Sequence, residues 1–413
     1  MKTLRNIICR INNNRLTVLL SCLSLCLILQ LIMLIRAING SALKDWGYSE
    51  FLLNYSAGFI RRGLPGSVLN SIYENFGLNP YLFLTLFLSL IIFIITISFF
   101  YLLNNSRLNG IQIFFIALNP MLINSAFLSV IMFRKDWLII FGLAIHALFN
   151  RLLSIGRLDS KNYILFFSFY ILYVQIVILS HEIAILFIFA HIFLIKSASH
   201  NLEQKHKKTM KKLILLYIGT QFTSFFFLAV NHGTQSQINK IVAGLPSEFK
   251  LGNISALNSI ANDPSQQFTN IASGMFTNTF SLIFFIIWLL IGPVFLHLLF
   301  NQTTSINYRW YFAAICPLLI LFVIGNDWGR WIVLISFVVL ILRLADSEIV
   351  DLKINSTPKK WRIVVPNIKI RIAILVIVLA VPILLIRIPI YTPKYPSDAL
   401  SGIFEVLFLN TTR

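Results

Sequence analysis

Apolar runs of about 20 residues recur along the whole chain, and they constrain the fold more than any other feature. Each run can cross a bilayer as a helix, in which every backbone polar group is hydrogen-bonded within the segment. The sequence therefore predicts an all-α, polytopic integral membrane protein of about 11 transmembrane helices, with residues 1–413 forming one membrane domain. The expected spans are 16–36, 80–103, 111–133, 137–155, 163–181, 183–196, 213–230, 277–300, 310–325, 332–345 and 369–387.

The composition excludes a soluble domain and argues against a nucleic-acid partner. Hydrophobic residues make up 57% of the chain and charged residues 12%, and the mean hydropathy is +0.81. In a soluble protein, the net charge of +19 would suggest nucleic-acid binding. In a membrane protein, it indicates basic loops held against an anionic cytoplasmic leaflet. We therefore expect the lipid bilayer as a partner, and no nucleic acid.

The distribution of basic residues orients the expected spans. With the N-terminus inside, most of the 34 Lys and Arg residues fall in inside segments, as the positive-inside rule requires. This orientation leaves two long outside loops, 37–79 and 231–276, and two main cytoplasmic loops, 197–212 and 346–368. Residues 163–196 could instead form one long helix. We divide them at His181-Glu182, because one helix would place the lysine-rich stretch 205–212 outside.

Three of the apolar hairpins carry charge at their tips. The tips are Arg134-Lys135-Asp136, His181-Glu182 and residues 326–331, which include Asp327 and Arg330. Ionised groups are costly near hydrocarbon, so their presence there indicates function by default. If the three tips lie on one face of the membrane, they can form a single site.

The first outside loop adds the acid Glu50 and the paired arginines Arg61 and Arg62, flanked by glycines. Arginine offers a planar fork that binds two phosphate oxygens at once, which favours a phosphate-binding role. The alternative is a pair of arginines whose guanidinium groups reach lipid headgroups. The sequence leaves both interpretations open.

His181-Glu182 interrupts an otherwise apolar stretch and has no charged neighbour in the sequence. A desolvated carboxylate without a cation holds a proton more tightly than in water, which suits a general base near neutral pH. Alternatively, Glu182 pairs across the bundle with Arg134 or Arg330. We rank Glu182 first as the catalytic base, followed by Asp327 and His181.

The other charged tips also have simpler explanations. Arg134 and Asp136 could pair within their own turn, and Asp327 could pair with Arg330 three residues later on one helical face. His146, His191 and His297 lie in or near spans, and we expect them to pack or to form hydrogen bonds between helices. No nucleotide or metal motif occurs, so we expect no cofactor and no metal.

Together these residues favour one substrate class, a lipid-linked phosphate or diphosphate sugar. Cations neutralise the phosphate and stabilise the charge that develops as it leaves, and a carboxylate takes the proton of the attacking sugar hydroxyl. The candidate substrate-binding residues are Arg61, Arg62, Arg134, Lys135, Arg330, Glu50 and Asp136.

With these features the chain resembles bacterial O-antigen or capsular polysaccharide polymerases of the Wzy type, and more widely the GT-C-like polytopic glycosyltransferases. The resemblance covers the whole length and rests on size, span number, Phe/Leu/Ile richness and two larger outside loops. It implies a GT-C-like bundle in the bacterial inner membrane with a periplasmic active face. It also implies an undecaprenyl-diphosphate-linked oligosaccharide as substrate, and a flippase and a chain-length regulator as partners.

Three other functions compete with this interpretation. A GT-C transferase that adds one sugar from a polyprenyl monophosphate would place its catalytic acid in the first outside loop, at Glu50 or Asp45. A flippase or transporter would place charge deep within the spans, whereas most charge here lies at span ends. A purely structural membrane scaffold leaves His181-Glu182 unexplained.

Overall fold

A computed structural model of the protein describes residues 15–39, 46–106, 108–117, 119, 133–231, 233–249, 257, 286, 289–300, 308–324 and 328–346. Over these residues the regular structure is helical, as expected. The longer helices are α2 (Arg15–Ile38), α4 (Leu64–Phe76), α5 (Pro80–Asn104), α9 (Asp136–Ser154), α10 (Ser160–Ser180), α11 (Ile188–Ser199), α12 (Gln204–Val230), α13 (Gln235–Gly244) and α20 (Trp328–Asp346). The shorter ones are α3 (Trp46–Glu50), α6 (Gly110–Ala117), η1 (Glu182–Phe187), η2 (Ser247–Phe249), η3 (Leu290–Val294), α17 (Phe295–Leu299), α18 (Tyr308–Ile315), η4 (Cys316–Ile320) and α19 (Leu321–Ile324).

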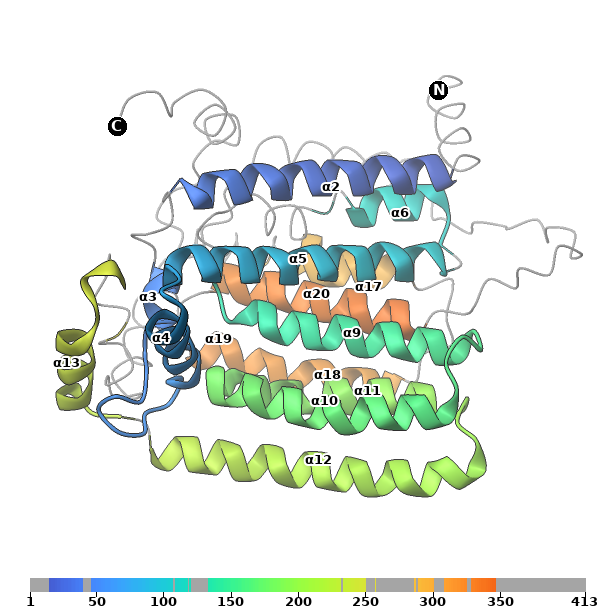
Figure 1. Cartoon of the computed structure of the whole chain (residues 1–413). Coiled ribbons are helices and arrows are strands. Elements are labelled where there is room, and N and C mark those ends of the chain that lie inside the picture. The colour runs from blue at the N-terminus through green and yellow to red at the C-terminus, as the bar shows by residue number, and fades with distance from the viewer. Residues whose placement is uncertain are drawn as a thin grey trace, which may run out of the picture.

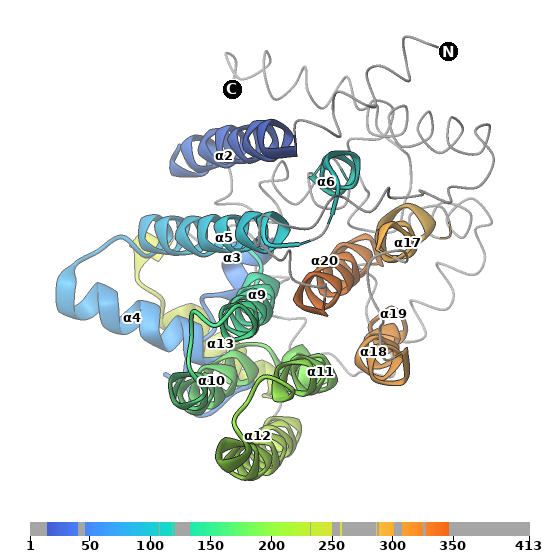
Figure 2. The same cartoon turned by 90° about the vertical axis from the view of Figure 1, so that its right-hand side faces the viewer.

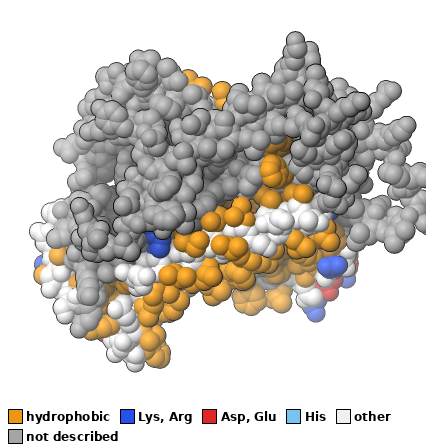
Figure 3. All heavy atoms as spheres, turned by 90° about the horizontal axis from the view of Figure 1, so that it is seen from above, with side chains coloured by type: hydrophobic (Ala, Val, Ile, Leu, Met, Phe, Trp, Pro, Cys, Tyr) orange, Lys and Arg blue, Asp and Glu red, His pale blue; other side chains and the backbone are white. Residues whose placement is uncertain are grey.

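Six of the described helical segments are long and apolar enough to cross a membrane: α2, α5, α9, α10, η1 with α11, and α12. Large apolar side chains on their outer faces, such as Leu31, Leu90 and Leu172, are more than half exposed. Figure 3 shows hydrophobic side chains over the middle of the visible described face and charged ones toward both of its ends. Exposed apolar bands of this kind are typical of a multi-pass membrane protein.

The long helices α2, α5, α9, α10, α12 and α20 run roughly parallel to one axis, whereas α4 and α13 lie across it at one end (Figure 1). Helices α9 and α20 begin at the left-hand end of this view, where α10 and α12 end. Seen along the axis, α20 lies between α9 on one side and α17 on the other, with α11 below it (Figure 2). Every side chain of α20 from Trp331 to Ala345 is buried, so this helix forms the centre of the core. The beginnings of α9 and α20 are thereby held at the same end of the bundle.

Local sequence explains where several helices start. Asn79 precedes Pro80, and its side-chain oxygen accepts hydrogen bonds from the backbone N–H groups of Tyr81 and Leu82 at the start of α5. Asp159 caps α10 in the same way. Helix α13 begins with a reciprocal capping box between Thr234 and Gln237.

The expected spans 16–36, 80–103, 137–155, 163–181 and 332–345 correspond to α2, α5, α9, α10 and α20, with ends displaced by a few residues. The division at His181-Glu182 is confirmed. Helix α10 ends at Ser180, His181 is extended, and the chain returns through η1 and α11. The expected span 310–325 is present as α18, η4 and α19. The second half of the expected span 277–300 is present as η3 and α17. Most of 111–133, residues 277–285 and 287–288, all of 369–387, and loop 346–368 except its first residue lie outside the described residues.

Three of the expected loops contain helices. The cytoplasmic loop 197–212 shrinks to a short turn, because α11 continues to Ser199 and α12 starts at Gln204. Lysine is a good helix former, so α12 starts before the apolar run 213–230 that marked the expected span. The first outside loop contains α3 and α4, and the described part of the second contains the short helices α13 and η2.

The buried histidines bind other helices, as expected. His146 Nδ1 of α9 lies 3.2 Å from His191 Nδ1 of α11, and His146 Nε2 lies 3.2 Å from the hydroxyl of Tyr163 on α10. The Tyr163 hydroxyl donates to Asn150 Oδ1 at 2.5 Å. His297 similarly contacts the Tyr311 hydroxyl at 3.1 Å. These bonds fix the relative positions of three helices whose outer ends carry the charged tips.

Candidate functional site

The described charged residues of the three hairpin tips and of the loop 37–79 meet at one end of the bundle. Glu50 ends α3, Arg62 precedes α4, Asp136 begins α9, Glu182 begins η1, and Arg330 lies in the first turn of α20. Ion pairs connect these segments across the bundle. We call the group made of Glu50, Arg61, Arg62, Arg134, Lys135, Asp136, His181, Glu182 and Arg330 the charge cluster.

Arg62 connects two carboxylates in the charge cluster. Its Nε donates to Glu182 Oε2 at 2.8 Å and its Nη2 to Glu182 Oε1 at 2.6 Å, a bidentate arrangement. Its Nη1 donates to Glu50 Oε1 at 3.2 Å. The guanidinium therefore points into the protein, and the lipid-headgroup interpretation is wrong for Arg62. The cation that compensates Glu182 is Arg62, supported by Arg61 at 3.6 Å, and neither Arg134 nor Arg330.

The backbone of Arg62 is also unusual. Its φ of 63° lies in the left-handed region, which a residue with a Cβ rarely adopts. Such a conformation costs on the order of 1 kcal/mol and persists where surrounding contacts hold it. The bidentate pair with Glu182 and the bond from Lys135 Nζ to the Arg62 carbonyl oxygen at 3.4 Å are such contacts. Strain concentrated at a buried ion pair is characteristic of a functional site.

Asp136 holds a second part of the cluster. His181 Nε2 lies 3.2 Å from Asp136 Oδ1, and Arg330 Nε lies 3.3 Å from Asp136 Oδ2. The Arg330 guanidinium also stacks on the Trp331 ring at 3.9 Å. Asp136 therefore brings the beginnings of α9 and α20 together with the residue that separates α10 from η1.

His181 is oriented as a proton acceptor. With Nε2–H donating to Asp136, neutral His181 carries its lone pair on Nδ1. That buried nitrogen has no hydrogen-bond partner among the described residues and lies 4.0 Å from Glu182 Oε2. A histidine held by a carboxylate on one nitrogen, with the other available, is the arrangement of a general base. If Nδ1 takes a proton, the resulting imidazolium lies between two carboxylates, with Asp136 at Nε2 and Glu182 near Nδ1.

Lys135 is a buried cation of the charge cluster and Glu50 a buried anion. Burial lowers the pKa of the Lys135 ammonium to about 7, which Glu50 offsets only in part. Burial alone would raise the pKa of the Glu50 carboxyl, but the cations Arg62, Lys135 and Arg134 outweigh it and lower that pKa to about 2. Glu50 is thus ionised at neutral pH, whereas the charge of Lys135 changes there.

Arg134 is buried beside these groups, and its charge acts on both Glu50 and Asp136. Asp327, the second-ranked candidate base, lies outside the described residues. Asp45, proposed for the rival single-sugar transferase, also lies outside them, and every other residue that the sequence analysis proposed for the site belongs to the cluster. The juxtaposition is observed, whereas the catalytic and binding roles remain predictions.

The cluster carries an excess of two positive charges when Lys135 is protonated and His181 is neutral. The helices α9, η1 and α20 also begin here, and helix N-termini add positive potential. A buried site with these properties suits an anion with two or more negative charges. An arriving phosphate would compete with Glu50, Asp136 and Glu182 for the same guanidinium groups.

No protein family model, curated protein or solved structure matches this chain. The function must therefore be inferred from the site itself.

Two features of the site could not be found from the sequence alone. Gly47 lies where a Cβ would be 1.9 Å from the carbonyl oxygen of Phe133, so only glycine lets α3 approach the turn before α9. The Lys135 ammonium also lies over the ring of Phe51, 5.4 Å from its centroid. The flanking glycines of the first loop are a signal of close approach, but the sequence does not say to what.

Among the described residues no group of three or more His, Cys, Asp or Glu side chains could hold a metal ion.

Proposed function

We propose that this protein is a membrane glycosyltransferase that polymerises glycan repeat units carried on undecaprenyl diphosphate. The chain would transfer the growing glycan to a sugar hydroxyl at the outer, periplasmic face of a bacterial inner membrane. The observation that carries the proposal is the buried cluster of five cations and three carboxylates at the end of the bundle opposite the lysine-rich start of α12. That separation agrees with a cytoplasmic basic end and an outer charged site.

In the proposed reaction, the diphosphate of the donor replaces the carboxylates as the anionic partner of the arginines. The two phosphates of the donor take over the guanidinium groups of Arg62, Arg61 and Arg330, which now hold carboxylates. Diphosphate is the leaving group, so these cations stabilise the charge that it acquires when the glycosidic C–O bond to it breaks. The donor lipid is already activated, so the reaction needs no nucleotide.

The acceptor hydroxyl must lose a proton as its oxygen attacks the anomeric carbon. His181 Nδ1 is the best placed acceptor, because Asp136 fixes the ring and the nitrogen has no other hydrogen-bond partner among the described residues. Glu182 was the first choice from the sequence, but in the free protein both of its oxygens bind Arg62. Glu182 becomes available only when the substrate displaces it. We therefore assign the proton to His181, stabilised by Asp136 and by the released Glu182.

A single-sugar transferase is a second candidate, because Glu50 of the first outside loop lies in the same cluster, 3.2 Å from Arg62. That enzyme would use a polyprenyl monophosphate sugar and Glu50 as its catalytic acid or base. The two functions differ in product. Repeated transfer gives a ladder of repeats, whereas the other enzyme adds one residue.

The decisive experiment uses the purified full chain in lipid nanodiscs with an undecaprenyl-diphosphate-linked oligosaccharide. Mass spectrometry should find products lengthened by whole repeats. The variant Arg62→Ala should abolish them, whereas Arg157→Ala should not, because Arg157 is an exposed arginine bound to Tyr101 at the other end of the bundle. Addition of one sugar from a monophosphate donor would replace the proposal with its alternative. Ladders made normally by Arg62→Ala would contradict both.

A further inference from the structure

An apolar groove of about 370 Å³ lies between α2 and α5 on the outside of the bundle. Its walls include Leu27, Leu31, Leu34, Leu86, Leu90 and Phe93. Leu31, Leu86, Leu90 and Phe93 are between 45% and 57% exposed, so the groove opens to the surroundings of the bundle. Its volume is within the range of small-molecule sites.

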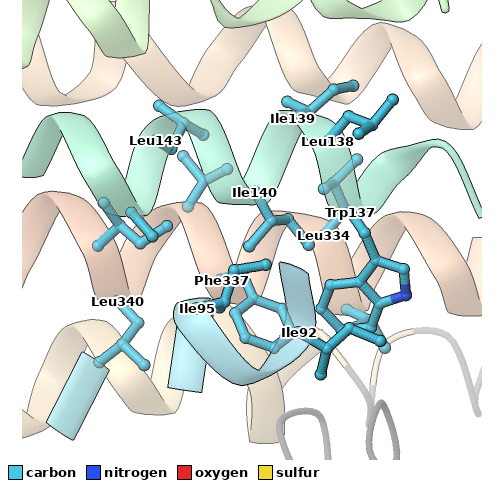
Figure 4. Packing of buried hydrophobic residues seen from close by; sticks show 14 of the residues in the cluster. Ile92, Ile95, Trp137, Leu138, Ile139, Ile140, Leu143, Leu334, Phe337 and Leu340 are labelled. Carbon is cyan, nitrogen blue, oxygen red and sulfur yellow. The ribbon is translucent and has the colours of Figure 1, made fainter. Parts of the chain in front are cut away.

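The groove continues toward the centre of the protein. Gln30 and Ile92 line both the groove and a smaller pocket of about 70 Å³ between α2, α5, α6, α9 and α20. Trp137 and Phe337 form the inner wall of that pocket, with ring centroids 5.8 Å apart. Figure 4 shows Trp137, Phe337, Ile92 and Ile95 gathered between α5, α9 and α20. This inner pocket thus lies between the groove and the first turn of α9.

The inner wall of this pocket is close in sequence to the charge cluster. Trp137 directly follows Asp136, and Phe337 lies two helical turns after Arg330 on α20. A molecule that occupied both places would have an anionic head in the cluster and a long hydrocarbon chain in the groove. A free phosphate would leave the groove empty. A bilayer phospholipid would keep its headgroup at the membrane surface, away from the buried cluster.

We propose that the groove between α2 and α5, with its inner pocket, binds the isoprenoid chain of the lipid-linked substrate whose diphosphate occupies the charge cluster. This inference rests on the proposed function and adds to it a second subsite and a lateral route of entry from the membrane. The chain fixes the direction from which the diphosphate approaches Arg330 and Arg62, past Trp137.

Photo-crosslinking tests the location directly. The probe is a long-chain polyprenyl diphosphate with a diazirine on an isoprene unit near the diphosphate, bound to the wild-type protein in nanodiscs. Mass spectrometry should find the label on α2 and α5. Labelling only on α10 or α12, or equal displacement of the probe by bilayer phospholipid, would overturn the inference.

Affinity measurements separate this inference from the proposed function. Leu90→Trp fills the groove and should weaken binding of the long-chain diphosphate at least about tenfold while leaving dimethylallyl diphosphate unchanged. The matched control Leu172→Trp makes the same change on an exposed position of α10 and should alter neither. If Leu90→Trp binds normally while Arg62→Ala loses both ligands, only the groove assignment fails. If neither ligand binds the wild type, the proposed function fails with it.

Discussion

Lys135 should make substrate binding depend on pH around neutrality. Its ammonium is buried at the start of α9 and faces Glu50, Arg62 and Glu182, and its pKa is lowered to about 7. Below pH 7 the side chain is charged in the free protein and attracts an anion. Above pH 7 it is neutral, so an anion must either recharge it or bind without it. Affinity for an anionic ligand should therefore fall as the pH rises.

The structure gives the size of this effect. Lys135 Nζ donates to the Arg62 carbonyl oxygen at 3.4 Å, and we take a separation on the order of 6 Å between this ammonium and a phosphate bound by the Arg62 guanidinium. Two unit charges at about 6 Å interact by about 3 kcal/mol at an effective dielectric constant near 20. Half of that energy, which allows for screening by Glu50 and Glu182, still corresponds to about tenfold in Kd. We expect this loss to be nearly complete between pH 6 and pH 9.

The assay is equilibrium binding of a polyprenyl diphosphate esterified at both ends, because such a ligand has no proton to lose in this range. Lys135→Arg keeps the charge at all pH values and should remove the dependence that belongs to Lys135. Lys135→Met should bind weakly throughout. His181 remains in every variant, so its contribution cancels in the comparison. An unchanged pH profile in Lys135→Arg, or tighter binding of wild type at pH 9 than at pH 6, would refute this reasoning.

Three further predictions follow from the same geometry. His181→Gln can still donate to Asp136 but cannot accept a proton, so turnover should fall at least a hundredfold with a nearly unchanged Kd for the diphosphate. Glu182→Gln removes the negative charge that pairs with Arg62, so the free energy of unfolding should fall by about 3 kcal/mol. Thermal unfolding in detergent measures this loss, and an unchanged melting temperature would argue against the buried pair. Gly47→Ala should cost about 1–3 kcal/mol by forcing α3 away from Phe133, whereas Gly219→Ala meets nothing within 4 Å and should not destabilise.

The sequence predicted the helical class, several spans and the residues that gather at the charged end. These features follow from local patterns, namely apolar runs, the bias of basic residues, and charge between paired runs. The split at His181-Glu182 was also predictable, because one continuous helix would have violated the charge bias. The agreement at the site arises because the tips of hairpins with the same orientation must lie on the same face.

The pairing of the charges could not be predicted. Arg62 and Glu182 are far apart in the sequence, and only the packing of α3 and α4 over the ends of α9 and α10 decides that they meet. Local rules instead favoured pairs within one turn, such as Arg134 with Asp136. For the same reason, the sequence ranked Glu182 first as the catalytic base, whereas our proposal, which uses the contacts between helices, assigns the proton to His181. Sequence distance says nothing about Nδ1 of His181 being the nitrogen without a hydrogen-bond partner among the described residues.

The 3₁₀ geometry of the six residues of η1 lengthens the segment that returns across the bundle after His181. A 3₁₀ segment rises about 2.0 Å per residue, so Glu182–Phe187 extends about 12 Å, where an α-helix would extend about 9 Å. The 12 residues of α11 add about 18 Å, and together the two match a hydrocarbon layer about 30 Å thick. Tighter winding thus lets a short return arm reach the opposite surface. An α-helical Glu182–Phe187 would draw either Glu182 or Lys196 toward the hydrocarbon.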